Sequence, residues 1–299
     1  STAIDENSAG AIVGDLTTTD EDANDTHTYT LTGDDAESFE VVDGQLKLKD
    51  SVSANYEVKN SYTVTVTATD SGGLSIASDY TVTINDVNDA PSAINLTGSL
   101  YINENTAGDV VGDITTVDED AGDSHTYSIS GADASSFEIV NGQLKLKDSV
   151  TGVFATKSSY SITVTSTDSA GAAISVDYNV EVNATPTDIS LSSYSVNESS
   201  YGLSVGTITA TDPNTDDEFT YSITGGADQD YFEIDSSGVL KLKDNKYADF
   251  EADDTLTVNI TVTDQGGLSF EKTLNISVND LAYATPDIPD IRPAWDVPY

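Results

Sequence analysis

The stretch from Tyr62 to Thr69, Tyr-Thr-Val-Thr-Val-Thr-Ala-Thr, alternates apolar and small polar side chains. Successive side chains of a β-strand point to opposite faces of a sheet, so this pattern predicts a strand with one buried face and one exposed face. The same alternation returns in residues 160–167 and 256–263. We therefore expect one long strand of this kind in each third of the chain.

The sequence around these strands occurs in three copies. An acidic stretch, Thr-Thr-Thr-Asp-Glu-Asp-Ala-Asn-Asp at residues 17–25, recurs closely at 115–123 and more loosely at 209–217. Disordered, low-complexity sequence would not keep such a register, so we expect folded repeats in spite of the acidic composition. A second motif, Leu-Lys-Leu-Lys-Asp, keeps the same register and lies at residues 46–50, 144–148 and 240–244.

Each copy has the composition of an antiparallel β-sandwich. Val, Ile, Thr and Tyr dominate the alternating runs, and Gly and Asp turns separate them. No stretch shows a sustained helical stripe of apolar residues. We predict an all-β fold of tandem Greek-key β-sandwich domains, arranged end to end, with six or seven strands in each. The predicted domains are residues 1–90, 91–185 and 186–281, followed by a Pro-rich tail or linker at 282–299.

The two ends of the chain differ from the repeat. Only five residues precede Glu6, whereas the second and third copies have leaders at 91–100 and 186–194. We expect from this that about half of a first strand is missing and that the chain is part of a longer array. The tail holds four of the seven prolines and Trp295, the one tryptophan. It is interpreted as a stiff linker or as a segment that docks on a neighbour.

The composition excludes several classes of partner. Asp and Glu number 52 against 11 Lys and Arg, which gives a formal charge of −41. Such a charge repels nucleic acid and anionic membranes, so we expect no nucleic-acid binding. The apolar runs are only strand-sized, so no membrane insertion is expected. The chain has no cysteine, so disulfides and Cys-based zinc sites cannot staple the domains.

Several acids and amides keep their position from copy to copy, as metal ligands would. Asp20 and Asp22 show the spacing that, at a strand end, points two side chains the same way. Converging carboxylates without Lys or Arg nearby repel one another, and a hard cation with six to eight oxygen ligands, Ca²⁺ above all, removes that repulsion. Magnesium fits less well because it prefers few protein ligands and many waters.

These acidic motifs also resemble those of a known family, the cadherin repeat. The match is to modules of the kind strung along large bacterial surface adhesins, and it covers about residues 1–281. The resemblance implies a secreted or cell-surface protein in which calcium at domain junctions stiffens a rod of neighbouring repeats. Asn55 and Ala90 stand where the family usually has Asp and Asn. The motifs that carry the resemblance are Asp20-x-Asp22, Asn55-x-Glu57, Asp70-x-Gly72 and Asp86-Val-Asn-Asp-Ala-Pro91.

Carried onto this sequence, the resemblance implies a complete calcium site between the first and second copies. Its ligands are Glu6, Asn55, Glu57, Asp86, Asn88 and Asp89 from the first copy, with Asp118, Asp120 and Asp168 from the second. The corresponding ligands at the outer ends of the array are Asp20, Asp22 and Asp70 in the first copy, and Glu198, Asp249, Glu251 and Asp280 in the third.

The junction between the second and third copies lacks part of this set. Val153 and Ala155 replace the amide and acid of the first copy, and the connector Asn-Ala-Thr-Pro at 183–186 is three residues shorter. Glu104, with Asp212, Asn214 and Asp264, leaves too few oxygens for a cluster of ions. We expect this second junction to be poor in calcium and able to bend.

An enzyme and a ligand-binding module are the alternatives to a calcium-dependent spacer. His27 and His125 occupy equivalent positions where the third copy has Phe219, so a structural role is expected for them. The acids lie in repeated polar clusters, not in the apolar cleft of a glycosidase, and no enzyme is expected. The alternative is a ligand-binding module that makes homophilic, glycan or protein contacts through one repeat or the tail. Candidate aromatic contacts are Tyr194, Tyr201, Tyr247, Phe250 and Trp295.

Overall fold

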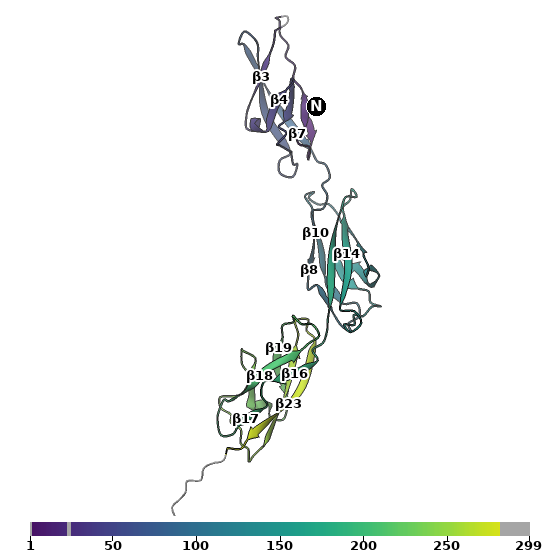
Figure 1. Ribbon diagram of the computed structural model, residues 1–299. Coiled ribbons are helices and arrows are strands. Elements are labelled where there is room, and N and C mark those ends of the chain that lie inside the picture. Colours follow the sequence, from purple (N-terminus) through teal and green to yellow (C-terminus); the bar gives the residue numbers. More distant parts are fainter. Residues whose placement is uncertain (1, 23–24, 282–299) are drawn as a thin grey trace, which may run out of the picture.

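The computed structural model describes residues 2–22 and 25–281, and these form three β-sandwiches that follow one another along the chain (Figure 1). The tail at 282–299, with Trp295, lies outside the described residues. We call the sandwiches repeats 1, 2 and 3. The connector between repeats 1 and 2 is the first junction, and the connector between repeats 2 and 3 is the second. The predicted all-β fold is confirmed, while the exact domain boundaries stay a prediction.

Repeat 1 pairs a four-stranded sheet, in the order β1-β7-β6-β3, with a three-stranded sheet, β2-β5-β4. The short helix η1 precedes β4. The elements are β1 (Ala3–Asp5), β2 (Ile12–Asp15), β3 (Thr28–Thr32), η1 (Ala36–Ser38), β4 (Phe39–Val42), β5 (Gln45–Leu48), β6 (Ser61–Thr69) and β7 (Ser75–Asn85).

Repeat 2 has two four-stranded sheets, ordered β11-β14-β15-β9 and β12-β13-β10-β8. Its elements are β8 (Ala93–Thr97), β9 (Tyr101–Asn103), β10 (Val110–Val117), β11 (Thr126–Ser130), η2 (Ala134–Ser136), β12 (Phe137–Val140), β13 (Gln143–Leu146), β14 (Ser159–Thr167) and β15 (Ala173–Asn183).

Repeat 3 has the same arrangement as repeat 2, with sheets ordered β17-β23-β22-β19 and β16-β18-β21-β20. Its elements are β16 (Asp188–Leu191), β17 (Ser195–Asn197), β18 (Ser204–Thr211), β19 (Thr220–Gly225), η3 (Gln229–Tyr231), β20 (Phe232–Ile234), β21 (Val239–Leu242), β22 (Thr255–Thr263) and β23 (Ser269–Asn279).

Repeats 2 and 3 thus have eight strands each, more than the six or seven expected. The difference arises because the opening strand splits in two and changes sheets: β8 pairs antiparallel with β10, and β9 pairs parallel with β15. Gly98, at φ +143°, lies at this crossing, where a Cβ would stand 2.3 Å from the carbonyl oxygen of Val111. Only glycine permits that approach, and the sequence pattern does not predict the crossing.

The long alternating strands form the centre of each core. In β22, Val258, Ile260 and Val262 are fully buried, while the residues between them are partly exposed. The predicted alternation is therefore confirmed. Burial of such side chains, at roughly 25 cal/mol per Å² of apolar surface, is the main stabilising contribution to each sandwich. Phe39 and its equivalents Phe137 and Phe232 lie in the three cores, each with 1–2% of its surface exposed.

The strand ends determine what meets at a junction. Strands β1 and β7 run parallel and end together at the lower end of repeat 1. At the upper end of repeat 2, the strands β10 and β14 end just before the acidic loop 118–123 and before Asp168. The acids predicted as ligands of the first junction therefore lie at the facing ends of repeats 1 and 2 (Figure 1). No helix in the described part of the chain is long and apolar enough to cross a membrane.

Candidate metal centres at the repeat junctions

Glu6 is a buried acid at the lower end of repeat 1, with 2% of its surface exposed. Its Oε2 accepts a hydrogen bond from the backbone N–H of Tyr56 at 2.6 Å, and its Oε1 accepts one from Val87 at 2.8 Å. The side chain therefore joins the end of β1, the loop before β6 and the connector that leaves β7. These bonds orient a carboxylate at the first junction.

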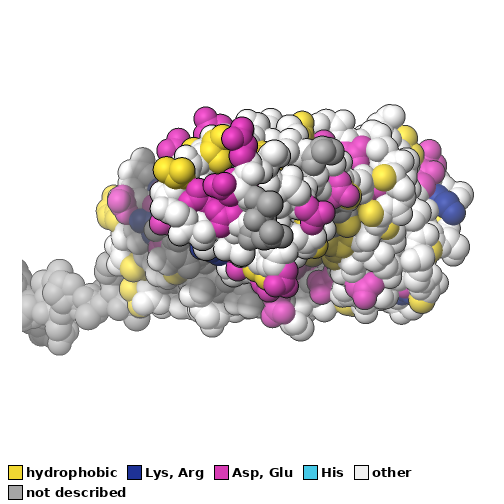
Figure 2. Space-filling view, turned by 90° about the horizontal axis from the view of Figure 1, so that it is seen from above, with side chains coloured by type: hydrophobic (Ala, Val, Ile, Leu, Met, Phe, Trp, Pro, Cys, Tyr) yellow, Lys and Arg dark blue, Asp and Glu magenta, His cyan; other side chains and the backbone are white. Residues whose placement is uncertain are grey.

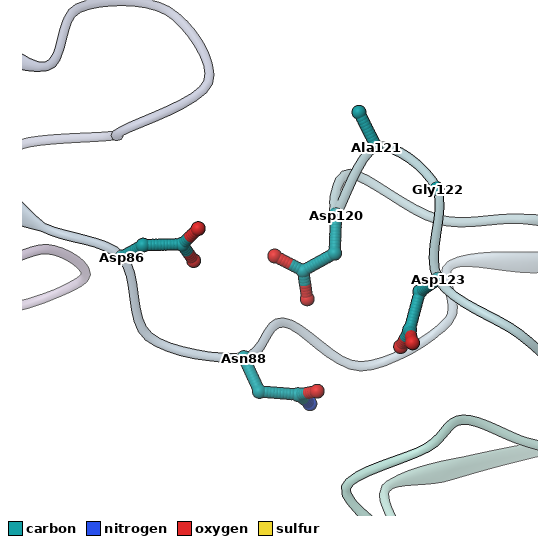
Figure 3. Close-up of a pocket in the computed structure, with 6 residues that line it drawn as sticks. All are labelled: Asp86, Asn88, Asp120, Ala121, Gly122 and Asp123. Carbon is teal, nitrogen blue, oxygen red and sulfur yellow. The ribbon is translucent and has the colours of Figure 1, made fainter.

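Two overlapping sets of carboxylates lie at this junction. Glu6, Glu57 and Asp89 each offer an oxygen, and the three oxygens lie within 4.8 Å of one another. Glu57 forms a second set, within the same distance, with Asp86 and Asp120. Figure 3 shows the carboxylates of Asp86 and Asp120 on opposite sides of an open groove, turned toward each other. Asp120 belongs to repeat 2, so the second set spans the two repeats.

Asp89 shows what this crowding does to a carboxylate. Its Oδ1 accepts a hydrogen bond from Asn7 Nδ2 at 2.9 Å, but its Oδ2 is buried without a hydrogen-bond partner among the described residues. Burial raises the pKa of Asp89, and the charges of Glu6 and Glu119 raise it further. A hard cation removes the repulsion and gives the buried oxygen a partner. Calcium, which takes six to eight oxygen ligands, fits this donor set.

Glu57 shows the same repulsion. A hydrogen bond from its own backbone lowers the pKa of Glu57, but burial and the charges of Glu6 and Asp86 raise the pKa by more. Because Glu57 belongs to both sets of carboxylates, it is the acid that two cations bound here would share.

The predicted ligands from repeat 2 meet the connector directly. Asp120 Oδ2 accepts a hydrogen bond from the backbone N–H of Asp89 at 2.8 Å. Asp168, with 5% of its surface exposed, accepts a bond from Asn88 Nδ2 at 3.0 Å on Oδ2. Its Oδ1 accepts the N–H groups of residues 170–172 at 2.6–3.0 Å. The hydrogen bond from Asn88 is the main cause that lowers the pKa of Asp168.

Asn55 lies at the first junction but contacts a residue that sequence reasoning missed. Its Oδ1 accepts a hydrogen bond from the N–H of Val58 at 2.7 Å, and its Nδ2 donates to Glu119 Oε2 at 2.8 Å across the junction. Glu119 is the middle residue of Asp-Glu-Asp and was not among the predicted ligands. The recurrence of Glu at positions 21 and 119 was the available signal.

Comparison of the sequence with protein families shows which family the chain belongs to. The model of the cadherin domain matches residues 1–85 and 192–279, which is more than half of the 299 residues. The chain belongs to the cadherin family. Cadherin domains are typically extracellular adhesion repeats that bind calcium at the junctions between domains.

Two similar relatives are much longer proteins. The cadherin chain is 30% identical over 262 residues to the Fat-like cadherin-related tumor suppressor homolog of Drosophila melanogaster, covering 81% of this chain and 5% of that protein. It is 27% identical over 301 residues to protocadherin Fat 1 of Homo sapiens, covering 93% of this chain and 6% of that protein. The chain thus spans only a small fraction of the length of these relatives.

Solved structures of cadherins are similar at lower identity. Extracellular cadherin domains 3–6 of protocadherin gamma B2 give a TM-score of 0.47 at 22% identity, covering 93% of this chain and 71% of that chain. Mouse cadherin-23 EC22-24 gives a TM-score of 0.46 at 20% identity, covering 93% and 95%. The fold itself follows from the strand order of each repeat.

Both histidines of this cadherin chain contact aspartates predicted as ligands. His125 Nε2 lies 2.8 Å from Asp118 Oδ2, and His27 Nε2 lies 3.1 Å from Asp20 Oδ2. Each imidazole thus lies against one carboxylate oxygen, a partner that was not foreseen, and the structural role expected of the histidines stays a prediction. The equal separation of seven residues in the two pairs was the signal for it.

The upper end of repeat 1 gathers three acids, of which two were predicted. Oxygens of Asp20, Asp25 and Asp70 lie within 4.8 Å of one another. Asp22 is exposed, and its backbone N–H donates to Asp20 Oδ1 at 2.9 Å. Asp25 was missed, although the last Asp of the acidic stretch recurs at 123 and 217 in the sequence. Its equivalent at 123 likewise lies within 4.8 Å of Asp118 and His125.

The lower end of repeat 3 brings together three of its four predicted ligands. Oxygens of Glu198, Glu251 and Asp280 lie within 4.8 Å of one another. Glu198 is buried and accepts the backbone N–H of Leu281 on Oε1 at 2.8 Å. Asp249 instead caps its own turn, where its Oδ1 accepts the N–H of Ala252 at 3.2 Å.

The second junction holds close contacts that the sequence did not suggest. Asn183 is buried, with 2% of its surface exposed, and its Nδ2 donates to Asp264 Oδ2 of repeat 3 at 3.0 Å. The connector is three residues shorter than the first, which draws the two sandwiches into direct contact. One acid next to this contact is unusual: burial, then the charges of Asp212 and Asp264, raise the pKa of Asp217 to about 6.

The surface of the molecule carries many acidic side chains. Figure 2, seen from above, shows Asp and Glu side chains spread over the face in view, with few Lys side chains between them. Many of these acids are solvated and keep the chain soluble. The acids at the first junction differ from these solvated acids because their oxygens converge within 4.8 Å, as do those at the upper end of repeat 1 and the lower end of repeat 3.

Proposed function

We propose that this cadherin chain is an extracellular spacer of a surface adhesin, secreted to the cell surface, in which calcium bound at the first junction fixes repeat 2 against repeat 1. The observation that carries the proposal is the pair of carboxylate sets that share Glu57 and span two repeats. Without a cation these charges repel, and with one they become ligands to a common ion. Calcium binding would therefore favour the aligned arrangement of the repeats. The resemblance to modules of large bacterial adhesins is part of the same proposal.

The residues that would hold calcium come from both sides of the junction. Glu6, Glu57, Asp86 and Asp89 come from repeat 1, and Asp120 comes from repeat 2. Asn88 and Asp168, which are joined by a hydrogen bond, supply a further amide oxygen and carboxylate next to them. Asp118 lies beside His125 in the same loop. Bound calcium would supply positive charge that links the loops of the two repeats.

Equilibrium dialysis with radioactive calcium tests the proposal. In 0.15 M NaCl, which screens the diffuse charge with a Debye length of about 8 Å, we expect saturable binding with a dissociation constant of roughly 10⁻⁴–10⁻³ M, the range of extracellular modules. Magnesium at the same concentration should displace little of it. Calcium uptake that rises linearly without saturation would show that the acids only attract a diffuse ion atmosphere, and the proposal would fail.

A second candidate function is a ligand-binding module, and one observation in repeat 3 favours it. Tyr201 and Tyr247 pack edge to face with ring centroids 5.1 Å apart, and 62% and 43% of their surfaces are exposed. Such amphipathic rings are common in binding surfaces. At the position of Tyr201, repeats 1 and 2 have Ala9 and Ala107 instead of an aromatic ring. The pair makes repeat 3 the part of the chain to inspect for a homophilic, glycan or protein contact.

A further inference from the structure

The connector of the second junction is buried, unlike that of the first. Asn183 and Ala184 each have 2% of their surface exposed, and Pro186 is buried as well. In the first connector, by contrast, Val87 is 41% exposed and Asp86 and Asn88 are exposed too. Buried backbone groups need hydrogen-bond partners, so the short connector must find them in the neighbouring sandwiches.

Asn183 makes the hydrogen bonds that two asparagines make at the first junction. By strand register it corresponds to Asn85, because each ends its strand opposite the end of the opening strand. Asn85 Nδ2 donates to Asp5 Oδ1 at 2.8 Å, and Asn183 Nδ2 donates to Asn103 Oδ1 at 3.0 Å. Asn183 also donates to Asp264, as Asn88 donates to Asp168. The side-chain amide of Asn183 therefore donates to both repeats, to Asn103 of repeat 2 and to Asp264 of repeat 3.

A second amide completes the contact. The backbone N–H of Ala184 donates to Asn214 Oδ1 at 2.7 Å, in the place where Asp89 N–H donates to Asp120 Oδ2 at 2.8 Å. The Nδ2 of Asn214 returns a bond to the carbonyl oxygen of Val182 at 3.1 Å. A neutral amide thus replaces a carboxylate and uses its own N–H₂ group as a donor, which a carboxylate cannot do.

Two carboxylates that face the connector of this junction have protein donors. Asp264 Oδ1 accepts the N–H of Leu268 at 2.9 Å, while its Oδ2 accepts the amide of Asn183. Glu104 Oε1 accepts the N–H of Thr185 at 2.8 Å. Residues 153, 155 and 184 are Val, Ala and Ala, so the acids and the amide that would crowd these carboxylates are absent. The need for a cation, evident at Asp89, is not repeated at these two acids.

Two further acids lie in the loop that follows β18, the loop whose Asn214 bonds the connector. Asp212 and Asp217 each keep one buried carboxylate oxygen without a hydrogen-bond partner among the described residues. Burial raises the pKa of Asp212, and the charges of Asp264 and of Glu104, which belongs to repeat 2, raise it further. A cation held among these acids would fix repeat 3 against repeat 2 and make the junction sensitive to EDTA, which the distance measurement below detects.

Strand β9 adds two contacts to the loop that follows β22. Tyr101 OH donates to the carbonyl oxygen of Gln265 at 3.1 Å, and Asn103 Nδ2 donates to that of Gly266 at 3.0 Å. The approach at Gly266 is so close that a Cβ there would stand 2.3 Å from Asn183 Nδ2 and 2.6 Å from Asn103 Oδ1. The first junction has Ala170 at the equivalent position.

We infer that repeats 2 and 3 are held in one orientation by direct amide hydrogen bonds centred on Asn183, without a metal ion. The chain would then combine two kinds of joint, one set by calcium and one independent of it. This inference concerns the second junction alone and does not rest on calcium binding at the first. It replaces the expectation of a bendable connector with that of a stiff one.

Distance measurements between two spin labels test the inference. The chain has no cysteine, so Ser128→Cys and Ser222→Cys, at exposed and equivalent positions of β11 and β19, give one label in repeat 2 and one in repeat 3. The full chain in EDTA is expected to show the same narrow distance distribution as in calcium. A distribution that broadens on adding EDTA would overturn the inference.

Gly266→Ala is the variant that separates the contact from the fold. The added methyl group should push the loop away from Asn183 and Asn103 and broaden the Ser128–Ser222 distance distribution in EDTA. The matched control is Gly72→Ala in repeat 1, where the nearest atom to a Cβ is 3.3 Å away in a side chain; it should leave that distribution narrow. Asn183→Ala should broaden the distribution as well. If both Gly266→Ala and Asn183→Ala leave it narrow, the amide contact does not hold the junction.

Two further measurements distinguish a broken contact from an unfolded repeat, and the second junction from the first. Circular dichroism melts should place the unfolding of Gly266→Ala close to that of the parent, because the clash lies between repeats and not within a core. A second label pair, Thr30→Cys with Ser128→Cys, reports on the first junction. Failure of calcium to act there would overturn the proposed function and leave the inference about the second junction standing.

Discussion

Removing calcium is expected to lower the melting temperature of repeats 1 and 2 by about 10 °C or more. Calcium at 10 mM is about ten to one hundred times the expected dissociation constant, so each ion bound only to the folded state stabilises that state by about 1.4–2.7 kcal/mol. For a domain of this size, 1 kcal/mol corresponds to roughly 4–8 °C. Since Glu57 lies in two carboxylate sets, more than one ion would contribute. Differential scanning calorimetry in 10 mM calcium and in EDTA measures the shift.

Salt gives the control for this experiment. In EDTA the carboxylates of the first junction repel, and salt screens that repulsion only partly because Glu6 and Asp168 are buried. Raising NaCl from 0.02 to 0.5 M in EDTA should therefore recover some of the lost stability, but less than calcium does. Equal melting curves in calcium and EDTA at both salt concentrations would be incompatible with a structural calcium site.

The substitution Asp120→Asn is expected to weaken calcium binding at the first junction at least tenfold, which is about 1.4 kcal/mol. It removes the one carboxylate of repeat 2 that lies in a set with Glu57 and Asp86. The fold should tolerate it, because Asn214 Oδ1 already accepts the equivalent backbone hydrogen bond in repeat 3. In EDTA the variant should melt no lower than the parent, since it carries one charge less in the repelling cluster. Equilibrium dialysis and calorimetry provide the two readouts.

Asp230→Asn is the matched control. Asp230 is exposed in the helix η3 of repeat 3, so the same loss of charge occurs far from the first junction. Its calcium affinity should equal that of the parent. If the two variants lose affinity equally, general charge and not a defined site explains calcium binding. If Asp120→Asn melts well below the parent in EDTA, its effect is structural.

Much of the fold could be predicted because the alternation of apolar and polar residues is a local property of the sequence. The alternation in β6, β14 and β22 fixes which side chains enter the core, and the repeated Leu-Lys-Leu-Lys motif gives Leu46 and Leu48, which are 2% and 0% exposed. The splitting of the opening strand could not be predicted in this way. In repeat 2 the backbone approaches closely at Gly98, and a lone glycine in a strand pattern has several possible meanings. Repeat 3 splits its opening strand as well, with Ser192 and Ser193 after β16.

The candidate site was predictable where a ligand repeats in register, and not where two repeats meet through unlike residues. Asp120 recurs in register with Asp22, Glu57 was implied by the family resemblance, and the two come together in one set. The contact from Asn55 to Glu119 joins side chains that only the packing of two sandwiches brings close. The hydrogen bonds of Asn183 could not be predicted for the same reason. The shortened connector suggested only a loss of ligands, whereas the amide bonds of Asn183 depend on how closely repeat 3 packs against repeat 2.

Calcium control of the first junction is the central claim, and the distance between Thr30→Cys and Ser128→Cys tests it most directly. Both positions are exposed, in β3 and β11 on either side of the junction. In 10 mM calcium we predict one narrow distribution of label distances. In EDTA the carboxylates repel and the distribution should broaden, while Asp120→Asn should give a broader distribution than the parent at low calcium concentration. A distribution that stays equally narrow in calcium and in EDTA would contradict the account.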